Sequence, residues 1–157
     1  MNREEIMQKL KTYEEHEIFY REYYLAKQNL NSKKSFLSQF DPNELYQKRL
    51  IVPDIKGSWR PTFMNEEIMD QRDLIKELTV LKHFRYTPAF KHEHSFYELV
   101  YCVSGSCQEE INDFKFTLTE GQFCLIPPRT THSIGVFDDS IVLNIIIWGR
   151  TFEDIFY

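Results

Sequence analysis

Residues 92–105 read HEHSFYELVYCVSG, and this stretch decides the fold and holds most of the candidate site. Its apolar and aromatic content predicts an extended strand, in which alternate side chains point to opposite faces. His92, His94, Phe96 and Glu98 should therefore share one face. In a small barrel the concave face is narrow, so polar groups there converge on a pocket and must be paired, hydrated or bound to a metal.

Outward from this stretch, the second half of the chain alternates β-type segments with turn residues. The turn signals are Ser104-Gly105-Ser106, Asn112-Asp113, Glu120-Gly121, Pro127-Pro128 and Asp138-Asp139. We predict strands over residues 79–88, 92–104, 107–112, 115–119, 122–126, 131–137 and 141–148. Short strands at this spacing are typical of an antiparallel barrel or sandwich. The acidic pairs Glu109-Glu110 and Asp138-Asp139 are expected to be solvated.

A third imidazole joins the candidate site from another strand. His132 follows the Pro127-Pro128 turn and should reach the same pocket from an adjacent wall. Three imidazoles and a carboxylate form a nitrogen and oxygen donor set that suits one divalent transition metal such as Zn, Ni, Fe or Mn. The candidate metal ligands are His92, His94, Glu98 and His132. The alternative is a hydrogen-bonded polar cluster that binds no metal.

The candidate ligand pocket contains these four side chains together with an apolar wall. The wall candidates are Phe96, Phe123 and Ile134, for which ordinary core packing is an equal alternative. Cys102, Cys107 and Cys124 lack the spacing of a zinc site or a disulfide framework, so we expect reduced thiols that pack as small apolar groups.

The first half of the sequence is charged and rich in tyrosine, and it predicts helices. Asn2 and Glu5 form a capping box that opens one helix to about Lys27. Residues 31–58 should be irregular apart from a short helix over 41–50, and a further helix is predicted over residues 65–78. We therefore divide the chain into a helical and irregular segment over 1–78, a barrel over 79–150 and the start of a helix over 151–157.

Composition excludes several classes of protein. The 157 residues fit one domain, and 42% hydrophobic with 27% charged residues argue against global disorder. The formal net charge of −5 argues against nucleic-acid binding by this chain itself. The charged N-terminus does not resemble a signal peptide, and the longest apolar run, 141–148, is too short for a membrane span. We expect a cytoplasmic protein without membrane contact.

Residues 92–105 match the end of the first cupin motif, H-x-H-x3-E-x6-G, at every position. The second motif, G-x5-P-x-G-x2-H-x3-N, is met by Gly121, Pro127 and His132. Tyr86, Arg129 and Val136 stand where the motifs have Gly, Gly and Asn, respectively. This resemblance implies a mainly β fold with N-terminal helices, in which the strands form an antiparallel cupin barrel of the double-stranded β-helix or jelly-roll type.

The fuller resemblance is to the N-terminal sensor domain of AraC-type bacterial transcription regulators. It rests on HEHSFYELVY at 92–101, GQFCLIPP at 121–128 and the following His132, and it covers about residues 79–150. It implies a homodimer that binds a small-molecule effector in the barrel and contains no catalytic residue. DNA would be bound only through a helix-turn-helix domain beyond residue 157, and Thr151 with its following acidic residues predicts the helix that leads there.

Two other functions fit the same pattern. A metal-dependent cupin enzyme, such as a dioxygenase, isomerase or decarboxylase, would use the four candidate ligands and leave positions open for substrate. A barrel that only dimerises is the third hypothesis. A further expectation concerns the outer face of the strand over 92–104, where Tyr97, Leu99, Tyr101 and Val103 are apolar and need a cover, either the N-terminal helix or a second subunit.

Overall fold

The computed structural model describes residues 2–65 and 78–156. The chain groups into two compact units, one of Met1–Arg60 with Phe84–Pro88 and the other of Pro61–His83 with Ala89–Tyr157. The helix predicted over residues 65–78 falls almost wholly outside the described residues. None of the described helices is both long and apolar enough to cross a bilayer.

The first unit contains four described helices, with bounds α1 Arg3–Lys11, α2 Glu15–Ala26, α3 Leu30–Leu37 and α4 Pro42–Gln47. The predicted cap of the first helix is present, because the Glu5 N–H donates to Asn2 Oδ1 at 2.9 Å and the Asn2 N–H donates to Glu5 Oε2 at 3.0 Å. Asp41 likewise caps α4, accepting from the Asn43 N–H at 2.7 Å. The aromatic core of this unit forms around Tyr20 and Tyr23.

Two predictions for this unit are wrong. The single helix expected to reach Lys27 is broken at Thr12, whose backbone is extended, and α2 starts with a second capping box between Glu14 and Glu17. The irregular stretch after residue 31 contains α3, because the Asn29 side chain accepts hydrogen bonds from the N–H groups of residues 31 and 32 and starts a helix there.

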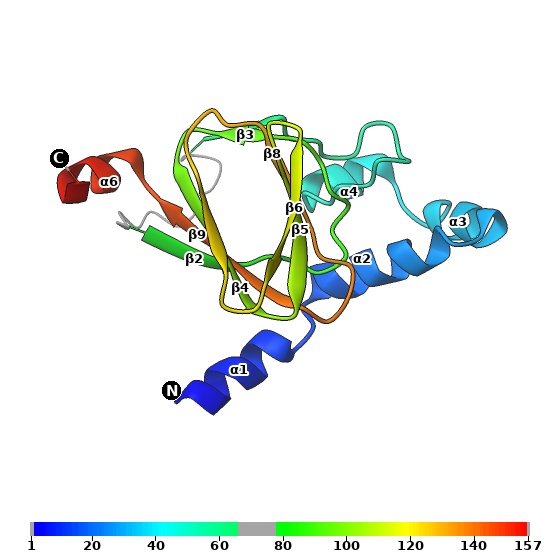
Figure 1. The fold of residues 1–157 in the computed structure, drawn as a ribbon. Helices are drawn as coiled ribbons and strands as arrows, with labels where there is room; N and C mark the ends of the chain where they lie inside the picture. Colours follow the sequence, from blue (N-terminus) through cyan, green and yellow to red (C-terminus); the bar gives the residue numbers. More distant parts are fainter. Residues whose placement is uncertain (1, 66–77, 157) are drawn as a thin grey trace. The chain divides into compact units, whose positions relative to one another are not determined.

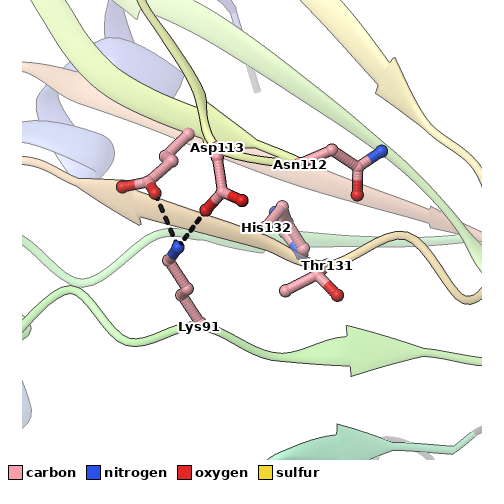
Figure 2. Close-up of a pocket in the computed structure, with 6 residues that line it drawn as sticks. Lys91, Asn112, Asp113, Thr131 and His132 are labelled. Atoms are coloured by element: carbon pink, nitrogen blue, oxygen red, sulfur yellow. Dashed lines mark hydrogen bonds and ion pairs between the residues drawn. The ribbon is translucent and has the colours of Figure 1, made fainter.

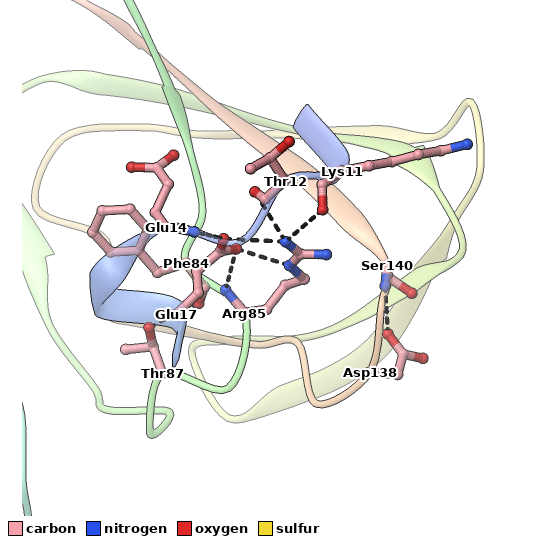
Figure 3. Close-up of polar contacts among 9 residues, drawn as sticks. All are labelled: Lys11, Thr12, Glu14, Glu17, Phe84, Arg85, Thr87, Asp138 and Ser140. Carbon is pink, nitrogen blue, oxygen red and sulfur yellow. Dashed lines mark hydrogen bonds and ion pairs between the residues drawn. The ribbon is translucent and has the colours of Figure 1, made fainter. Parts of the chain in front are cut away.

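A buried ion pair fixes the break between α1 and α2. Glu17 Oε1 accepts from Arg85 Nε at 2.8 Å, and its other oxygen accepts from the Glu14 N–H at 2.9 Å (Figure 3). The Arg85 guanidinium also donates to the carbonyls of Lys11 and Thr12, at 3.1 and 3.3 Å. These bonds satisfy the carbonyl groups that the end of α1 leaves without helical partners.

The second unit contains two antiparallel sheets and a short parallel pair (Figure 1). One sheet has the order β2 (Leu78–Lys82), β9 (Ile141–Ile147), β4 (Tyr97–Ser104) and β7 (Phe123–Ile126). The other has the order β6 (Phe114–Thr119), β5 (Ser106–Ile111) and β8 (His132–Gly135), while β1 (Phe63–Met64) pairs in parallel with β3 (Glu93–His94). The prediction of antiparallel sheets with N-terminal helices is confirmed.

The hydrophobic core of this unit contains side chains from both sheets. Val100, Ile126 and Val142 of the first sheet pack with Cys107 and Ile134 of the second. The core therefore lies between the sheets, as in a barrel or sandwich whose inward positions alternate with outward ones. The three cysteines are unpaired as predicted, and burial raises the pKa of the thiols of Cys107 and Cys124 to about 12, which keeps them protonated.

Most strand bounds follow the sequence pattern, with two corrections. The strand predicted over residues 79–88 ends at Lys82, because residues 84–88 belong to the first unit, where Arg85 is bound by Glu17. The strand predicted over residues 92–104 is interrupted at Ser95 and Phe96, so it forms β3 and β4. The alternation is unaffected, because the even-numbered residues from 92 to 102 are all buried.

The apolar outer face of β4 has a partial cover in the last helix. Helix α6 (Gly149–Phe156) begins two residues before the predicted cap at Thr151, since the Phe152 N–H donates to the Trp148 carbonyl at 3.0 Å. The Phe152 ring stacks on the Tyr97 ring with 3.8 Å between centroids. At Tyr97, therefore, the cover that this apolar face was predicted to need is provided by α6.

Turn geometry explains why particular residues separate the strands. Gly105 has a φ of 77°, and a Cβ atom there would lie 2.1 Å from Ser140 Oγ, so only glycine fits. Asn112 and Asp113 both have positive φ, at 47° and 68°, as the two central residues of a type I′ hairpin turn require. The turn predicted at this pair is therefore confirmed, and it joins β5 to β6 as a hairpin.

Arg129 occupies a backbone position that favours glycine. Its φ is 60°, its side chain is exposed, and its N–H donates to the His94 carbonyl at 2.8 Å. We expect Arg129→Gly to raise the free energy of unfolding by about 0.5–1 kcal/mol, because the strain of a left-handed non-glycine residue exceeds the added chain entropy of glycine. Urea unfolding measures this, and Arg129→Ala, which keeps the Cβ atom, is the control. Equal effects of the two substitutions would contradict the strain argument.

Candidate functional site

The structure brings the four candidate ligand side chains together from β3, β4, β8 and the residue before β3. His92, His94, Glu98 and His132 are all buried, with exposed fractions of 6%, 0%, 5% and 1%. Glu98 Oε2 lies 3.2 Å from His94 Nε2 and 3.3 Å from His132 Nε2. The backbones of residues 92 and 132 exchange two hydrogen bonds of 3.0 Å, which fixes the spacing of their imidazoles.

Backbone carbonyls orient two of the imidazoles. His92 Nδ1 lies 3.1 Å from the Phe90 carbonyl oxygen, and His94 Nδ1 lies 2.6 Å from the Phe96 carbonyl oxygen. A carbonyl only accepts, so each Nδ1 carries the proton and each Nε2 of the neutral ring keeps a free lone pair. Metal-binding histidines commonly have this arrangement: one ring nitrogen faces the metal, and the N–H of the other donates to a backbone carbonyl.

The side chains of this cluster meet without making hydrogen bonds to one another. His94 Nε2, Glu98 Oε2 and both ring nitrogens of His132 are buried and have no hydrogen-bond partner among the described residues. The contacts of 3.2 and 3.3 Å from Glu98 to the imidazoles of His94 and His132 are within ion-pair distance without being hydrogen bonds. Lone pairs that face each other at this distance are stabilised by a cation between them.

The donor atoms are close enough to bind one ion. Single ligand atoms from His92, Glu98 and His132 all lie within 4.8 Å of one another. Two ligand atoms at about 2.0–2.2 Å from one ion lie at most about 4.4 Å apart, which is close to this limit. His92, Glu98 and His132 therefore fit a divalent transition metal in chemistry and come close to it in spacing.

Electrostatics gives these groups the protonation states that metal binding requires. Burial lowers the pKa of His132 to about 3, against the opposing effect of Glu98, and burial also lowers the pKa of His92. Burial alone would raise the pKa of Glu98, but the neighbouring imidazoles of His94 and His132 outweigh it and lower this pKa below its ordinary value. At neutral pH His92 and His132 are thus neutral imidazoles, and Glu98 is an ionised carboxylate.

Two of the three predicted wall residues lie in the interior. Phe96 stacks on the His94 ring with 4.4 Å between centroids and an angle of 5°, and its edge meets Trp148. Ile134 is buried in the core between the sheets. Phe123 does not line the interior, because it is 61% exposed while Cys124 and Ile126 of the same strand take the inward positions. This part of the prediction is wrong.

A pocket of about 350 Å³ reaches the cluster at His132 (Figure 2). The other residues that line it are polar: Lys91, Glu110, Asn112, Asp113 and Thr131. The Lys91 ammonium group forms ion pairs with Glu110 at 2.8 Å and with Asp113 at 2.5 Å. A small polar molecule in this pocket would lie beside the His132 imidazole.

Sequence reasoning missed polar residues in the barrel interior. Glu109 is only 2% exposed, whereas the acidic pair to which it belongs was expected to be solvated. Only Glu110 fits that expectation, since it pairs with Lys91 and Lys115 on the rim. The signal was present in the alternation, because Cys107 and Glu109 share one face of β5 and the exposed Gln108 lies between them. Asn144 takes an interior position on β9 by the same rule.

The fold and the site define a double-sheet β domain with a buried imidazole and carboxylate cluster. Residues 81–145, less than half of the chain, match the model of one family, the AraC-like ligand binding domain. This match confirms, over these residues, the resemblance that the motifs carry. No curated protein matches the sequence significantly.

Several solved structures are similar to this chain. KdgF from a Halomonas species has 23% identity and a TM-score of 0.42, covering 50% of this chain and 75% of its own. A cupin protein from Bacteroides fragilis has 21% identity and a TM-score of 0.40, covering 48% of this chain and 69% of its own. Oxalate decarboxylase from Bacillus subtilis has 25% identity and a TM-score of 0.41, covering 48% of this chain and 22% of its own.

Proposed function

We propose that this chain is the effector-sensing and dimerising part of an AraC-type transcription regulator, and that a small molecule binds in the barrel at the His/Glu cluster. The observation that carries the proposal is the set of buried ligand atoms that have no hydrogen-bond partner in the described part of the chain, within a region that matches a ligand-binding family. Unsatisfied buried polar atoms cost stability, so their presence at a pocket favours a role in binding. Effector binding controls attached helix-turn-helix domains if it favours one arrangement of the homodimer over another.

The cluster would hold one divalent transition metal through the Nε2 atoms of His92, His94 and His132 and the carboxylate of Glu98. When bound, such a metal acts as a Lewis acid that attracts an oxygen atom of the ligand. The polypeptide contributes the orientation: the Phe90 and Phe96 carbonyls hold two imidazoles with their lone pairs toward the cluster. The buried Phe96 ring, which stacks on the His94 ring, excludes water from that side of the cluster.

The metal site has a direct test in metal titration of the chelator-treated protein. Isothermal titration calorimetry with Zn²⁺, Ni²⁺ and Mn²⁺ should give one site per chain. His132→Gln should lower the metal affinity by about 100-fold or more, because it removes one imidazole ligand from the site. His16→Gln, which removes an imidazole of the first unit, should bind as the wild type does. Equal affinities of wild type and His132→Gln would contradict this metal site.

The sensing role is tested by effector binding rather than by turnover. A small molecule that stabilises the wild-type chain against heat should lose this effect in His94→Gln, and should shift the monomer–dimer equilibrium measured by sedimentation. Binding without any effect on self-association would count against the regulatory role. The rim ion pairs of Lys91 offer a second check, because Lys91→Met changes the pocket entrance without touching the cluster.

A metal-dependent enzyme is the second candidate, and the donor set of three imidazoles and one carboxylate favours it. A divalent metal held by these four side chains would keep coordination positions open for substrate. Turnover that requires stoichiometric Fe or Mn and disappears in His94→Ala would establish this function. Effector binding that leaves the small molecule chemically unchanged supports the sensor.

A further inference from the structure

The barrel interior contains a second polar layer behind the His/Glu cluster. On one sheet Ile111 of β5 pairs with His132 of β8, and two residues further along Glu109 pairs with Ile134. On the other sheet Glu98 pairs with Ile146, and two residues further along Val100 pairs with Asn144. Each step of two residues is about 7 Å. Glu109 and Asn144 therefore lie one step inward from the cluster, on opposite sheets.

Strand register and electrostatics place these two side chains at the same depth. Besides burial, the charge of Glu109 raises the pKa of the Cys124 thiol, so the two side chains lie near each other. Cys124 is the strand partner of Val100, and Val100 in turn pairs with Asn144 on β9. The next layer inward is apolar and includes Cys107 and Val142 of the core. Glu109 and Asn144 are thus the last polar side chains before the apolar core on this path.

Three oxygen atoms of this layer lack partners. Both carboxyl oxygens of Glu109 and Oδ1 of Asn144 are buried without a hydrogen-bond partner among the described residues. The strand partners of Glu109 are Phe116 and Ile134, which have no polar side-chain atoms to offer. An unsatisfied buried carboxyl group destabilises the folded state, and an aliphatic side chain at this position would avoid that cost. Such a group in the interior between the two sheets, one strand step from the His/Glu cluster, is therefore unexplained by folding alone.

We propose that Glu109 and Asn144 form the floor of the effector pocket, where they bind a hydroxyl group of a short effector whose other end lies at the His/Glu cluster. This inference rests on the proposed sensing function and names the class of effector: a small hydroxylated molecule. The distance of one strand step, about 7 Å, spans a chain of roughly four to five bonds. A hydroxyl group fits better than an ammonium group because burial raises the pKa of Glu109 to about 8, which favours the neutral carboxyl form at pH 7.

Matched pairs of small molecules test this assignment on the 157-residue chain. The probes are 4-hydroxybutyrate against butyrate and 1,4-butanediol against 1-butanol, with 4-aminobutyrate as the ammonium probe. NMR titration of the ¹⁵N-labelled protein measures their affinities at millimolar concentration. In the wild type the hydroxylated member of at least one pair should bind about fivefold to tenfold more tightly, which corresponds to one net hydrogen bond.

Variants assign this preference to the floor. Glu109→Leu should bind both members of the pair equally, while Glu120→Gln, which removes an exposed turn carboxylate, should keep the wild-type preference. Glu109→Gln retains one hydrogen-bond acceptor and should lose only part of the preference for the hydroxylated probe. This variant therefore tests the role of Glu109 even if Glu109→Leu does not fold.

The outcomes separate this inference from the proposed function. Equal binding of both members in the wild type, a preference that persists in Glu109→Leu, or tighter binding of 4-aminobutyrate than of 4-hydroxybutyrate overturns the hydroxyl floor and leaves the sensor intact. Absence of binding by every probe also overturns the floor, while metal binding that depends on His132 would still support the cluster.

Discussion

Replacing Arg85 by Met should lower the free energy of unfolding by about 3–5 kcal/mol, the largest stability loss that we expect from one substitution in this chain. Arg85 and Glu17 are both buried, with side-chain exposures of 3% and 0%. Methionine fills much of the volume of the arginine stem but leaves the Glu17 carboxylate without its cation. An uncompensated buried charge costs far more than the net stabilisation of the intact pair.

The pair is more than a single contact. Glu17 accepts from the Arg85 backbone N–H at 3.2 Å and from two guanidinium nitrogens at 2.8 and 3.1 Å. The guanidinium carbon also lies 3.7 Å from the centre of the Tyr13 ring, within range of a cation–π interaction. Removing Arg85 therefore leaves the end of α1 and the start of α2 without the group that joins them.

Urea unfolding followed by circular dichroism measures the loss. Arg85→Lys keeps the charge but not the planar fork of donors, so it should recover only part of the stability. The double variant Arg85→Met with Glu17→Met should be less destabilised than Arg85→Met alone, because no charge stays unpaired. Lys48→Met breaks the exposed pair with Glu44 and should change little. An Arg85→Met effect as small as that of Lys48→Met would contradict the buried-pair argument.

The same ion pair shows what sequence reasoning could not predict about the helices. Residues 2–27 have a continuous helical pattern, and the cap at Asn2 could be predicted because Asn2 and Glu5 are three residues apart. The break at Thr12 depends on Arg85, which is 68 positions from Glu17 in the sequence. A contact of that separation leaves no trace in a local pattern.

The strands were predictable where polar and apolar residues alternate. In residues 92–102 the histidines and Glu98 mark one face, and the structure buries that face throughout. Strand β7 reads Phe-Cys-Leu-Ile, and without a polar residue the pattern does not say which face points inward. The assignment of Phe123 to the pocket was therefore wrong by one position in register, which moves a side chain to the opposite face.

Glu109 shows a different error. Two adjacent acidic residues suggested a solvated turn, although the strand pattern placed Glu109 with Cys107 on the inward face. Charged side chains are expected at the surface because their burial is costly. The prediction for Glu109 followed this expectation rather than the alternation of inward and outward residues along β5. The residues that break such a rule are often functional, which is consistent with the floor proposed for the pocket.

Replacing Glu109 by Gln should stabilise the chain, and the gain should grow as pH rises. Burial raises the pKa of Glu109 from 4.5 to about 8, with a further contribution from the charge of Glu98. A carboxyl group with a raised pKa in the folded state stabilises folding fully only below its unfolded pKa, and this contribution is lost as pH rises toward the folded pKa. At pH 7 the wild type should thus be less stable than Glu109→Gln by on the order of 2–3 kcal/mol.

Urea unfolding of metal-free protein at pH 5, 6, 7 and 8 measures this difference, and its slope with pH is the diagnostic quantity. The buried imidazoles of His92 and His132 lower the stability of both proteins at acid pH, so their contribution cancels when the variant is compared with the wild type. Glu120→Gln, at an exposed turn position, should show no such slope. A gain in Glu109→Gln that stays constant from pH 5 to pH 8 would mean that packing, rather than the protonation of a buried carboxyl group, causes it. The apolar surroundings of Glu109 would then be no obstacle to its ionisation, and a hydroxyl group would have no advantage over an ammonium group at the floor of the pocket.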